Sequence, residues 1–193
     1  MAHICIVRHG QTDWNLKGKL QGQTDIPLNE TGRKQAGECR EFLKDMDWDV
    51  VVTTSLKRAK ETAEIINESL GLPLLEMDQF KERSFGEGEG MTREAREEKY
   101  PGFQFPGMET REELHDRIED GLQQILKQFP GKKVLLVSHG AVIHAMINRY
   151  HVDGDKLEEF RLFNGCLTNL SFEDEGWNVH DYNVTDHLVE TKG

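Results

Sequence analysis

The sequence predicts an α/β fold, a three-layer α/β/α sandwich with a mainly parallel sheet, an antiparallel edge strand and a helical lid insertion. Short apolar runs rich in Val and Ile recur along the chain, a pattern typical of strands buried on both faces. Stretches with apolar residues at helical spacing separate these runs. A hairpin pattern near the C-terminus supplies the antiparallel strand.

Four apolar runs are predicted to form the parallel strands. Residues 4–7 (Ile-Cys-Ile-Val) are fully apolar and stop at Arg8-His9-Gly10. Residues 49–53 form the second run, and residues 72–75 form the third, with a proline near its start where a missing N–H is tolerated. Residues 134–137 are again fully apolar and stop at Ser138-His139-Gly140. The strong β propensity of these runs indicates buried strands.

Helices are predicted between and after these strands. Residues 56–70 carry apolar side chains at helical spacing, and Gly71 is expected to cap the C-terminus of that helix. Residues 110–129 form a second predicted helix with Thr110 as its N-cap. Residues 141–150 form a third. Strands that alternate with helices in this way favour parallel pairing.

Two later features complete the architecture. Residues 167–172 and 178–182 are predicted to form a hairpin joined by Asp174-Glu175-Gly176. Residues 86–108, rich in Gly, Glu, Arg and Pro, lack a clear strand signal and are expected to form a helical insertion or lid over the sheet. No repeat or low-complexity linker divides the 193 residues, so we expect residues 1–193 to form a single domain.

The composition excludes several classes of partner. The chain carries 24 basic and 35 acidic side chains, a formal net charge of −11, which disfavours binding to nucleic acids and to anionic lipid. No apolar stretch approaches the roughly 18 residues that span a bilayer. The three cysteines, Cys5, Cys39 and Cys166, show no C-x-x-C spacing and follow no secretory leader, which favours a reducing, cytoplasmic location. Cys5 is expected to be a small buried apolar residue.

Chemically useful side chains follow three of the predicted strands. His9 and His139 each come directly after an apolar strand, beside Arg8 in the first case, and Arg58 comes shortly after residues 49–53. Parallel strands bring these ends to one edge of the sheet, where ligands of open α/β sheets bind. Alone, such a histidine is often a hydrogen-bonded loop residue, and such an arginine is usually solvated. Their conjunction predicts a functional site.

The order of these motifs resembles the histidine phosphatase superfamily, the phosphoglycerate mutase-like proteins. The motifs are residues 8–15 (Arg-His-Gly-Gln-Thr-Asp-Trp-Asn), residues 20–28, Gly32, Gln35 and Ala36, residues 55–63, Glu82 before Phe85-Gly86, and residues 138–141. The resemblance covers nearly the whole chain and is nearest to the small bacterial PhoE-like phosphatases of broad specificity.

The resemblance implies a role for each matching residue. His9 corresponds to a nucleophile that forms a phosphohistidine. Arg8, Arg58 and His139 correspond to a phosphate pocket. Glu82 corresponds to the proton donor. Family alignment, rather than spacing, selects Glu82 from the glutamates nearby in the sequence, which are Glu76, Glu87, Glu89 and Glu109.

Three more residues are expected to contact substrate. They are Asn15, Gln21 and Gly140. Asn15 has an alternative role, capping its own loop. No metal and no cofactor is expected, because the chain contains no H-E-x-x-H or H-x-H motif and because His139 and His144 are five residues apart, off one helical face.

The sequence therefore predicts a metal-independent phosphatase, a phosphoric monoester hydrolase acting on a small-molecule phosphomonoester, with no nucleic acid or membrane partner, as a monomer or homodimer. A phosphoglycerate mutase is the first alternative. Two features favour hydrolysis: the chain is compact, and the predicted lid segment carries apolar rather than basic residues. The apolar residues of that segment are Met91, Tyr100, Phe103, Phe105 and Met108. These apolar residues equally fit ordinary packing of the insertion. A catalytically silent binding module of the same fold is the second alternative.

Overall fold

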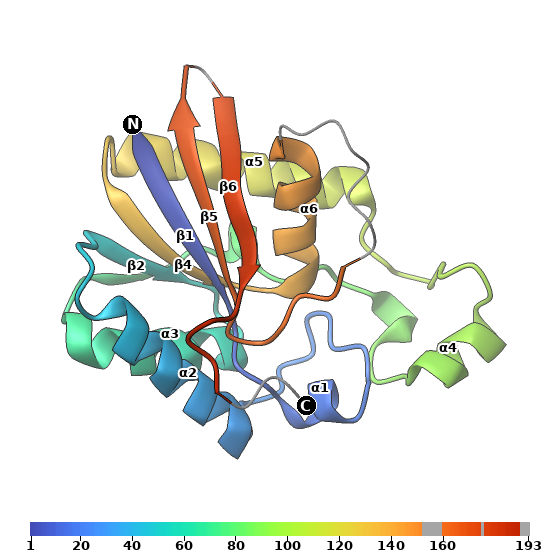
Figure 1. Ribbon diagram of the computed structural model, residues 1–193. Helices are drawn as coiled ribbons and strands as arrows, with labels where there is room; N and C mark the ends of the chain where they lie inside the picture. The colour runs from blue at the N-terminus through green and yellow to red at the C-terminus, as the bar shows by residue number, and fades with distance from the viewer. Residues whose placement is uncertain (152–159, 175, 190–193) are drawn as a thin grey trace.

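A computed structural model describes residues 1–151, 160–174 and 176–189. Its centre is a six-stranded mixed sheet with the order β3-β2-β4-β1-β5-β6 (Figure 1). The strands are β1 (Ala2–Arg8), β2 (Val50–Thr53), β3 (Leu74–Glu76), β4 (Lys133–Ser138), β5 (Leu167–Glu173) and β6 (Gly176–Val184).

The pairing divides the sheet into a parallel and an antiparallel part. β4 pairs in parallel with both β1 and β2, and β2 pairs in parallel with β3. β5 runs antiparallel to β1, and β6 runs antiparallel to β5. The predicted fold class is therefore confirmed, and the predicted hairpin forms the two antiparallel strands at one side of the sheet.

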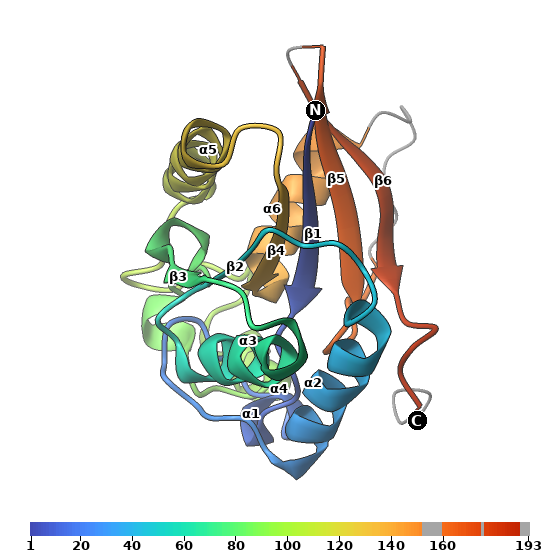
Figure 2. The ribbon, with the colours of Figure 1, turned by 90° about the vertical axis from the view of Figure 1, so that its left-hand side faces the viewer.

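Helices cover both faces of this sheet, as Figures 1 and 2 show. The α-helices are α1 (Asp13–Leu16), α2 (Glu30–Leu43), α3 (Lys57–Leu70), α4 (Arg93–Lys99), α5 (Arg111–Gln128) and α6 (Gly140–Tyr150), and two short 3₁₀ helices are η1 (Asp78–Phe80) and η2 (Gly86–Gly88). Apolar side chains of α5 and α6 pack on one face, against Ile4 and Leu136. Those of α2 and α3 pack on the other, against Cys5 and Leu135.

The two central strands explain why their sequences are apolar at every position. Successive side chains of a strand point to opposite faces, and both faces of β1 and β4 are covered. Ile4, Ile6, Leu135 and Leu136 are fully buried, and Cys5 is 1% exposed, as predicted for a small buried apolar residue. Each buried Ile or Leu contributes about 1.5–3 kcal/mol. The central strands are therefore the most strongly packed part of the sheet.

The predicted helix boundaries agree with the observed caps. Thr110 caps α5, with its side chain accepting from the backbone N–H of Glu113, while the Glu113 side chain accepts from the backbone N–H of Thr110. Gly71 ends α3 in the left-handed conformation, with φ of 62°. None of the helices in the described ranges has the length and apolar character that a membrane crossing requires.

Two local features differ from the expectations, and a third agrees in its helical content. α2 was not predicted, because its buried face is made mostly of small or polar residues such as Gly32, Gln35 and Ala36 rather than large apolar ones. β3 begins at Leu74, after Pro73, and not at residue 72. Residues 86–108 contain η2 and α4, so their helical content is observed, and α4 lies apart from the sheet at the right of Figure 1.

Candidate active site

The carboxyl ends of the two central strands bring two histidines together. Arg8 is paired with Ser138 at the end of the β1–β4 ladder. His9 and His139 follow directly, and the backbone N–H of His9 donates to the carbonyl of Ser138 over 3.1 Å. Their ring centroids are 5.4 Å apart. The structure thus brings together the two histidines that the sequence predicts to share an edge.

The hydrogen bonding of His9 determines which of its ring nitrogens carries a proton. Nδ1 lies 2.7 Å from the carbonyl oxygen of Gly10. Since a carbonyl only accepts, Nδ1 must be protonated, and in a neutral ring Nε2 then carries the lone pair. Burial, followed by the charges of Arg58 and Arg8, holds the pKa of His9 well below its usual value. His9 is therefore a neutral imidazole with a free lone pair.

Arg58 places a buried cation beside this ring. It lies in the first turn of α3 and is fully buried. Its Nη1 donates to the carbonyl of Thr24 over 2.9 Å and its Nη2 to that of Gly22 over 2.6 Å. Burial lowers the pKa of Arg58 to about 10, so the guanidinium remains charged at neutral pH. Two loop carbonyls therefore fix its orientation.

A carboxylate from the segment 86–108 organises that loop. Glu89 accepts from the backbone N–H groups of Gln23 and Thr24, each over 3.0 Å, and from the Thr24 hydroxyl over 2.5 Å. It also accepts from the backbone N–H of Phe85 over 3.0 Å. Gly22 has φ of 52°, and a Cβ there would lie 2.1 Å from Glu89 Oε1. Only glycine permits this approach. Through its hydrogen bonds, Glu89 fixes the loop whose carbonyls orient Arg58.

Arg8 and His139 complete a cluster of buried nitrogen donors. Arg8 Nη1 donates to the carbonyl of Leu162. His139 is fully buried, and its Nε2 lies 2.8 Å from the hydroxyl of Thr54. Burial, with Arg58 next, holds the pKa of His139 well below its usual value. Arg8 Nε, Arg58 Nε and His139 Nδ1 are buried and have no hydrogen-bond partner within the described part of the chain.

Buried N–H groups without partners are rare in folded proteins because each costs roughly 1–3 kcal/mol. Arg8 Nε and Arg58 Nε are such N–H groups, and His139 Nδ1 is one when Nε2 of the same ring accepts from the Thr54 hydroxyl. An anion bound beside His9 would supply partners for them. This arrangement can therefore hold a phosphate beside the Nε2 atom of His9.

Glu82 lies at the mouth of the same region. It is 8% exposed. Its carboxyl group accepts from the backbone N–H of Arg83 over 2.9 Å and from that of Ala141 over 3.1 Å. Arg117 on α5 donates to the backbone carbonyl of Glu82 over 3.1 Å. The side chain is thus held at a fixed place while one carboxyl oxygen keeps bonding capacity.

The other glutamates near Glu82 in the sequence are engaged elsewhere. Glu76 pairs with Lys60, Glu87 accepts from the Tyr100 hydroxyl, and Glu109 pairs with Arg117. Glu89 is occupied by the loop described above. Of these five carboxylates, Glu82 is the one that lines the cavity at the strand ends.

That cavity has a volume of about 350 Å³. Its lining residues are Arg8, Asn15, Leu20, Glu82, Phe85, Gly140, Ala141, His144, Arg161, Leu162 and Asn164. His9, Arg58 and His139 are not in this lining and are almost fully buried. The cavity and the predicted group therefore share Arg8 and Glu82.

Two of the three remaining predicted residues line the cavity, and the third does not. Gly140 and Asn15 line the cavity. Asn15 also fulfils its alternative role, because its Oδ1 accepts from the backbone N–H of Thr12 over 3.0 Å within the capping box of α1. Gln21 does not line the cavity; its Oε1 accepts from the Thr12 hydroxyl over 2.7 Å. Gln21 therefore supports the loop next to the site.

Several lining residues were missed by sequence reasoning. Asn164 donates to the carbonyl of His9 over 3.0 Å and to Asn15 Oδ1 over 3.3 Å. Arg161 and Leu162 come from the same loop before β5, and His144 comes from α6. No sequence pattern singles out this loop, because it follows the last predicted helix and carries none of the quoted motifs.

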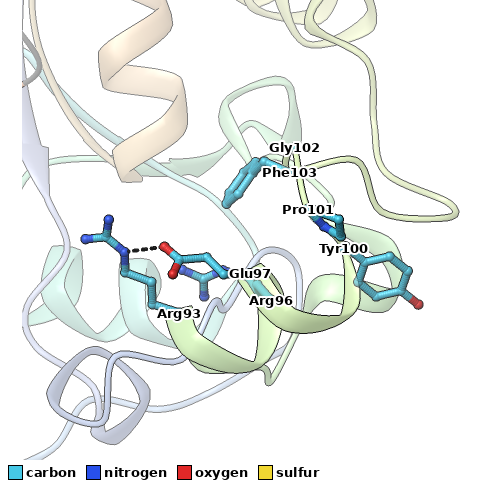
Figure 3. A pocket seen from close by; sticks show the side chains of 7 residues that line it. All are labelled: Arg93, Arg96, Glu97, Tyr100, Pro101, Gly102 and Phe103. Carbon is cyan, nitrogen blue, oxygen red and sulfur yellow. Dashed lines mark hydrogen bonds and ion pairs between the residues drawn. The ribbon is translucent and has the colours of Figure 1, made fainter.

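A larger hollow beside α4 has a different character (Figure 3). It measures about 630 Å³ and is lined by Arg93, Arg96, Glu97, Tyr100, Pro101, Gly102 and Phe103. Arg93 pairs with Glu97 over 2.8 Å, and Arg96 donates to the carbonyl of Met91 and lies over the Phe103 ring. Its cations are thus already engaged. Within the described ranges, no cluster of three or more His, Cys, Asp or Glu side chains is suited to a metal.

Comparison with known proteins decides the family. Residues 4–185 match the model of the histidine phosphatase superfamily (branch 1). The chain belongs to this superfamily. The resemblance indicated by the sequence motifs is therefore confirmed, and the chain is a phosphoric monoester hydrolase whose substrate is a small-molecule phosphate.

Relatives in this superfamily carry both phosphatase and mutase-like names. The chain is 53% identical over 188 residues to the uncharacterized phosphatase PhoE of Bacillus subtilis, covering 97% of each protein. It is 34% identical to phosphoglycerate mutase-like protein 4 of Arabidopsis thaliana, covering 98% of this chain and 88% of that protein. A solved structure of Entamoeba histolytica phosphoserine phosphatase with 3-phosphoglyceric acid superposes with a TM-score of 0.82 at 30% identity, covering 98% of this chain and 100% of that chain.

Proposed function

We propose that this protein is a metal-independent phosphatase that hydrolyses small organic phosphomonoesters through a phosphohistidine at His9. One observation carries the proposal. A neutral imidazole with its Nε2 lone pair free is grouped with three buried, unpartnered nitrogens, Arg8 Nε, Arg58 Nε and His139 Nδ1. A nucleophile inside a ring of donors is what an in-line attack on phosphorus requires.

In the first step, His9 Nε2 attacks phosphorus, a nitrogen–phosphorus bond forms, and the bond to the ester oxygen breaks. The guanidinium groups of Arg8 and Arg58 stabilise the charge on the phosphoryl oxygens. Glu82 transfers its proton to the leaving alkoxide. His139 donates from Nδ1 if its Nε2 accepts from the Thr54 hydroxyl, a tautomer that the 2.8 Å contact permits.

In the second step, water attacks the phosphohistidine and the nitrogen–phosphorus bond breaks. Glu82, now a carboxylate, takes the proton of the attacking water. Phosphate leaves, and His9 returns to its neutral form with the Nδ1 proton still donated to Gly10. Division into two displacements lowers each barrier and keeps both at one set of donors.

The size of the cavity supports a small substrate. A volume of about 350 Å³ lies near the lower end of the range of roughly 300–1,000 Å³ for ligand pockets. Leu20, Phe85 and Leu162 give it apolar walls, which suit the organic part of a phosphomonoester. A phosphoserine phosphatase among the relatives fits this class of substrate.

We further propose that the chain forms one domain in which residues 86–108 serve as a lid. Glu89 ties this segment to the loop beside Arg58, which supports a link between the segment and the site. The aromatic residues of the segment pack on one another, which favours their alternative role in ordinary packing. The ring centroids of Phe103 and Phe105 are 4.8 Å apart, and those of Tyr100 and Phe105 are 5.5 Å apart.

Location and assembly follow as proposals of the same kind. Cys5, Cys39 and Cys166 are free and buried, which is compatible with a reducing compartment and supports the cytoplasm. We expect a monomer or a homodimer, which light scattering of the purified protein would distinguish.

The central test measures hydrolysis of p-nitrophenyl phosphate in EDTA by the wild-type protein and by His9→Ala. We expect turnover in the wild type and a loss of at least about 10⁴-fold in the variant, since it lacks the nucleophile. A phosphoryl group on the wild-type chain, labile to acid and absent from His9→Ala, would support the intermediate. His115→Ala on α5 is a matched control. Equal turnover in His9→Ala would contradict the proposal.

A second assay separates hydrolysis from mutase activity. With 3-phosphoglycerate we expect release of inorganic phosphate and no isomer with the phosphate moved to the neighbouring oxygen. A mutase must shield its phosphoenzyme from water. Isomerisation faster than phosphate release would overturn the assignment as a phosphatase.

A further inference from the structure

Arg161 is a cation of the cavity that the proposed mechanism does not use. It lines the cavity with Arg8 and Glu82, and its charge acts on the guanidinium of Arg8. Asn183 holds its backbone, accepting from the N–H of Phe163 and donating to the carbonyl of Arg161, each over 3.0 Å. The backbone that carries this cation is therefore fixed at the cavity.

Within the described residues, the guanidinium of Arg161 has no carboxylate partner of the kind that several other arginines have. Arg33 pairs with Glu61, Arg40 with Glu68 and Arg149 with Glu119, over 2.6 to 2.8 Å. Within the described residues, Arg161 has one contact of its charged group, with the ring of Phe163 at 5.8 Å, and no ion pair. Among the described residues, the guanidinium is therefore available to a ligand.

We propose that Arg161, together with His144, binds a carboxylate carried by the leaving group of the substrate, so that the preferred substrates are phosphomonoesters of small hydroxy acids. This inference rests on the proposed function, because the carboxylate is recognised on an ester whose phosphate lies beside His9. A guanidinium fork matches a carboxylate with two parallel hydrogen bonds.

A carboxylate fits this wall better than a second phosphate. The proposed phosphate pocket uses two arginines and two histidines, whereas the second wall offers the single guanidinium of Arg161, which balances a single negative charge. A volume of about 350 Å³ also leaves little room beyond one phosphate and a short carbon chain.

His144 supplies a neutral hydrogen-bond donor at the same wall. It lines the cavity and packs against Phe160 in a tilted arrangement, with ring centroids 4.6 Å apart. Burial, followed by the charge of Arg8, lowers the pKa of His144, so the ring is neutral near pH 7 and offers one N–H. Asn164 is already committed to His9 and Asn15. Arg161 and His144 therefore remain as the ligands.

Glu82 is the one acidic side chain among the described residues that line the cavity. Its carboxyl group accepts from the backbone N–H groups of Arg83 and Ala141 and forms no ion pair with Arg161 in the described part of the chain. The guanidinium of Arg161 is therefore not neutralised by this carboxyl group.

The test compares two esters that differ only in the carboxylate. 3-Phosphoglycerate and glycerol phosphate of matching configuration have the same carbon skeleton, with a carboxylate in one and a hydroxymethyl group in the other. We expect wild-type kcat/KM to favour 3-phosphoglycerate, and Arg161→Gln to lower the ratio of the two kcat/KM values by about 10- to 100-fold, the range for a charge-assisted hydrogen bond. The change should lie mainly in KM, with Arg161→Lys intermediate.

Arg40→Gln is the matched control, because it removes the same charge from an exposed arginine of α2 and should keep the wild-type ratio. Hydrolysis of both esters with a ratio that Arg161→Gln leaves unchanged would overturn the carboxylate site and leave the phosphatase intact. A wild-type protein that prefers glycerol phosphate would do the same. Failure to release phosphate from either ester or from p-nitrophenyl phosphate would instead remove the proposed function itself.

Discussion

The cavity at the strand ends and the hollow beside α4 both contain arginines, but the guanidinium groups have different partners. In the hollow, Arg93 and Arg96 are bound to a carboxylate, a carbonyl and an aromatic ring. At the strand ends, Arg8 and Arg58 bind backbone carbonyls that fix their position and keep Nε unpartnered. The hollow is the larger of the two, about 630 Å³ against 350 Å³. The region with the unpartnered arginine Nε groups is therefore the smaller of the two.

The largest expected difference between the two regions comes from removing one arginine from each. Arg58→Gln should lower kcat/KM for p-nitrophenyl phosphate by about 10³-fold, because a guanidinium that stabilises a transferring phosphoryl group is worth roughly that much. Arg96→Gln beside α4 should change it by less than about twofold, the range of an ordinary surface substitution. Circular dichroism of both variants checks the fold. Comparable losses in the two variants would remove the distinction between the regions.

The next effect tests whether Glu89 orders the loop that holds Arg58. Glu89→Ala removes the acceptor of four hydrogen bonds, so the carbonyls of Gly22 and Thr24 are no longer fixed, and kcat/KM should fall by about 10- to 100-fold. Glu87→Ala, two residues away and bound only to the Tyr100 hydroxyl, is the control and should stay near wild type. Partial recovery is expected in Glu89→Gln, which keeps one acceptor. Wild-type kinetics in Glu89→Ala would mean that the loop is ordered without this carboxylate.

A smaller effect concerns the pH dependence of kcat/KM, which reports ionisations of the free enzyme. The reactive form of His9 is neutral, and its pKa lies below the usual value because of burial and two arginines. An imidazole with the ordinary pKa of about 6.5 loses roughly threefold of its neutral fraction between about pH 7 and pH 6. With p-nitrophenyl phosphate we expect a smaller decrease. A decrease of threefold or more over this interval would indicate an ordinary histidine.

The smallest effect is on stability. His9 and His139 both have a lowered native pKa, so below about pH 6.5 the unfolded chain binds protons that the native chain does not. Stability should therefore be complete above this pH and fall below it, by up to about 1.4 kcal/mol per pH unit for each histidine. Urea unfolding near pH 7 and pH 5.5 measures the slope. His9→Asn should have a shallower slope than the wild type, and equal slopes would contradict the argument.

Much of the fold, and the core of the candidate site, could be predicted because both depend on strand ends. The runs at residues 4–7 and 134–137 are apolar at every position, so parallel pairing followed, and with it the proximity of His9 and His139. The location of Arg58 at the same edge of the sheet could be predicted because Arg58 comes shortly after β2. Glu82 required the family resemblance, because spacing alone did not distinguish it from the other glutamates.

The remainder could not be predicted for physical reasons. α2 buries Gly32, Ala36 and Cys39, side chains too small to give a helical pattern of large apolar residues. The part played by Glu89 depends on a loop whose carbonyls carry no side-chain signal. Arg161 and Asn164 reach the cavity through a loop before β5, and their proximity to Arg8 depends on antiparallel pairing of β5 with β1. Such tertiary contacts leave no local pattern.

His9 and His139 directly follow the two middle strands, and this position has a thermodynamic consequence. Edge strands, short helices and loops open locally at low cost, whereas central strands with both faces covered open only when the molecule unfolds as a whole. We therefore expect the two imidazoles to lie next to the backbone that exchanges most slowly among the described residues. Heat inactivation should then coincide with cooperative melting instead of preceding it.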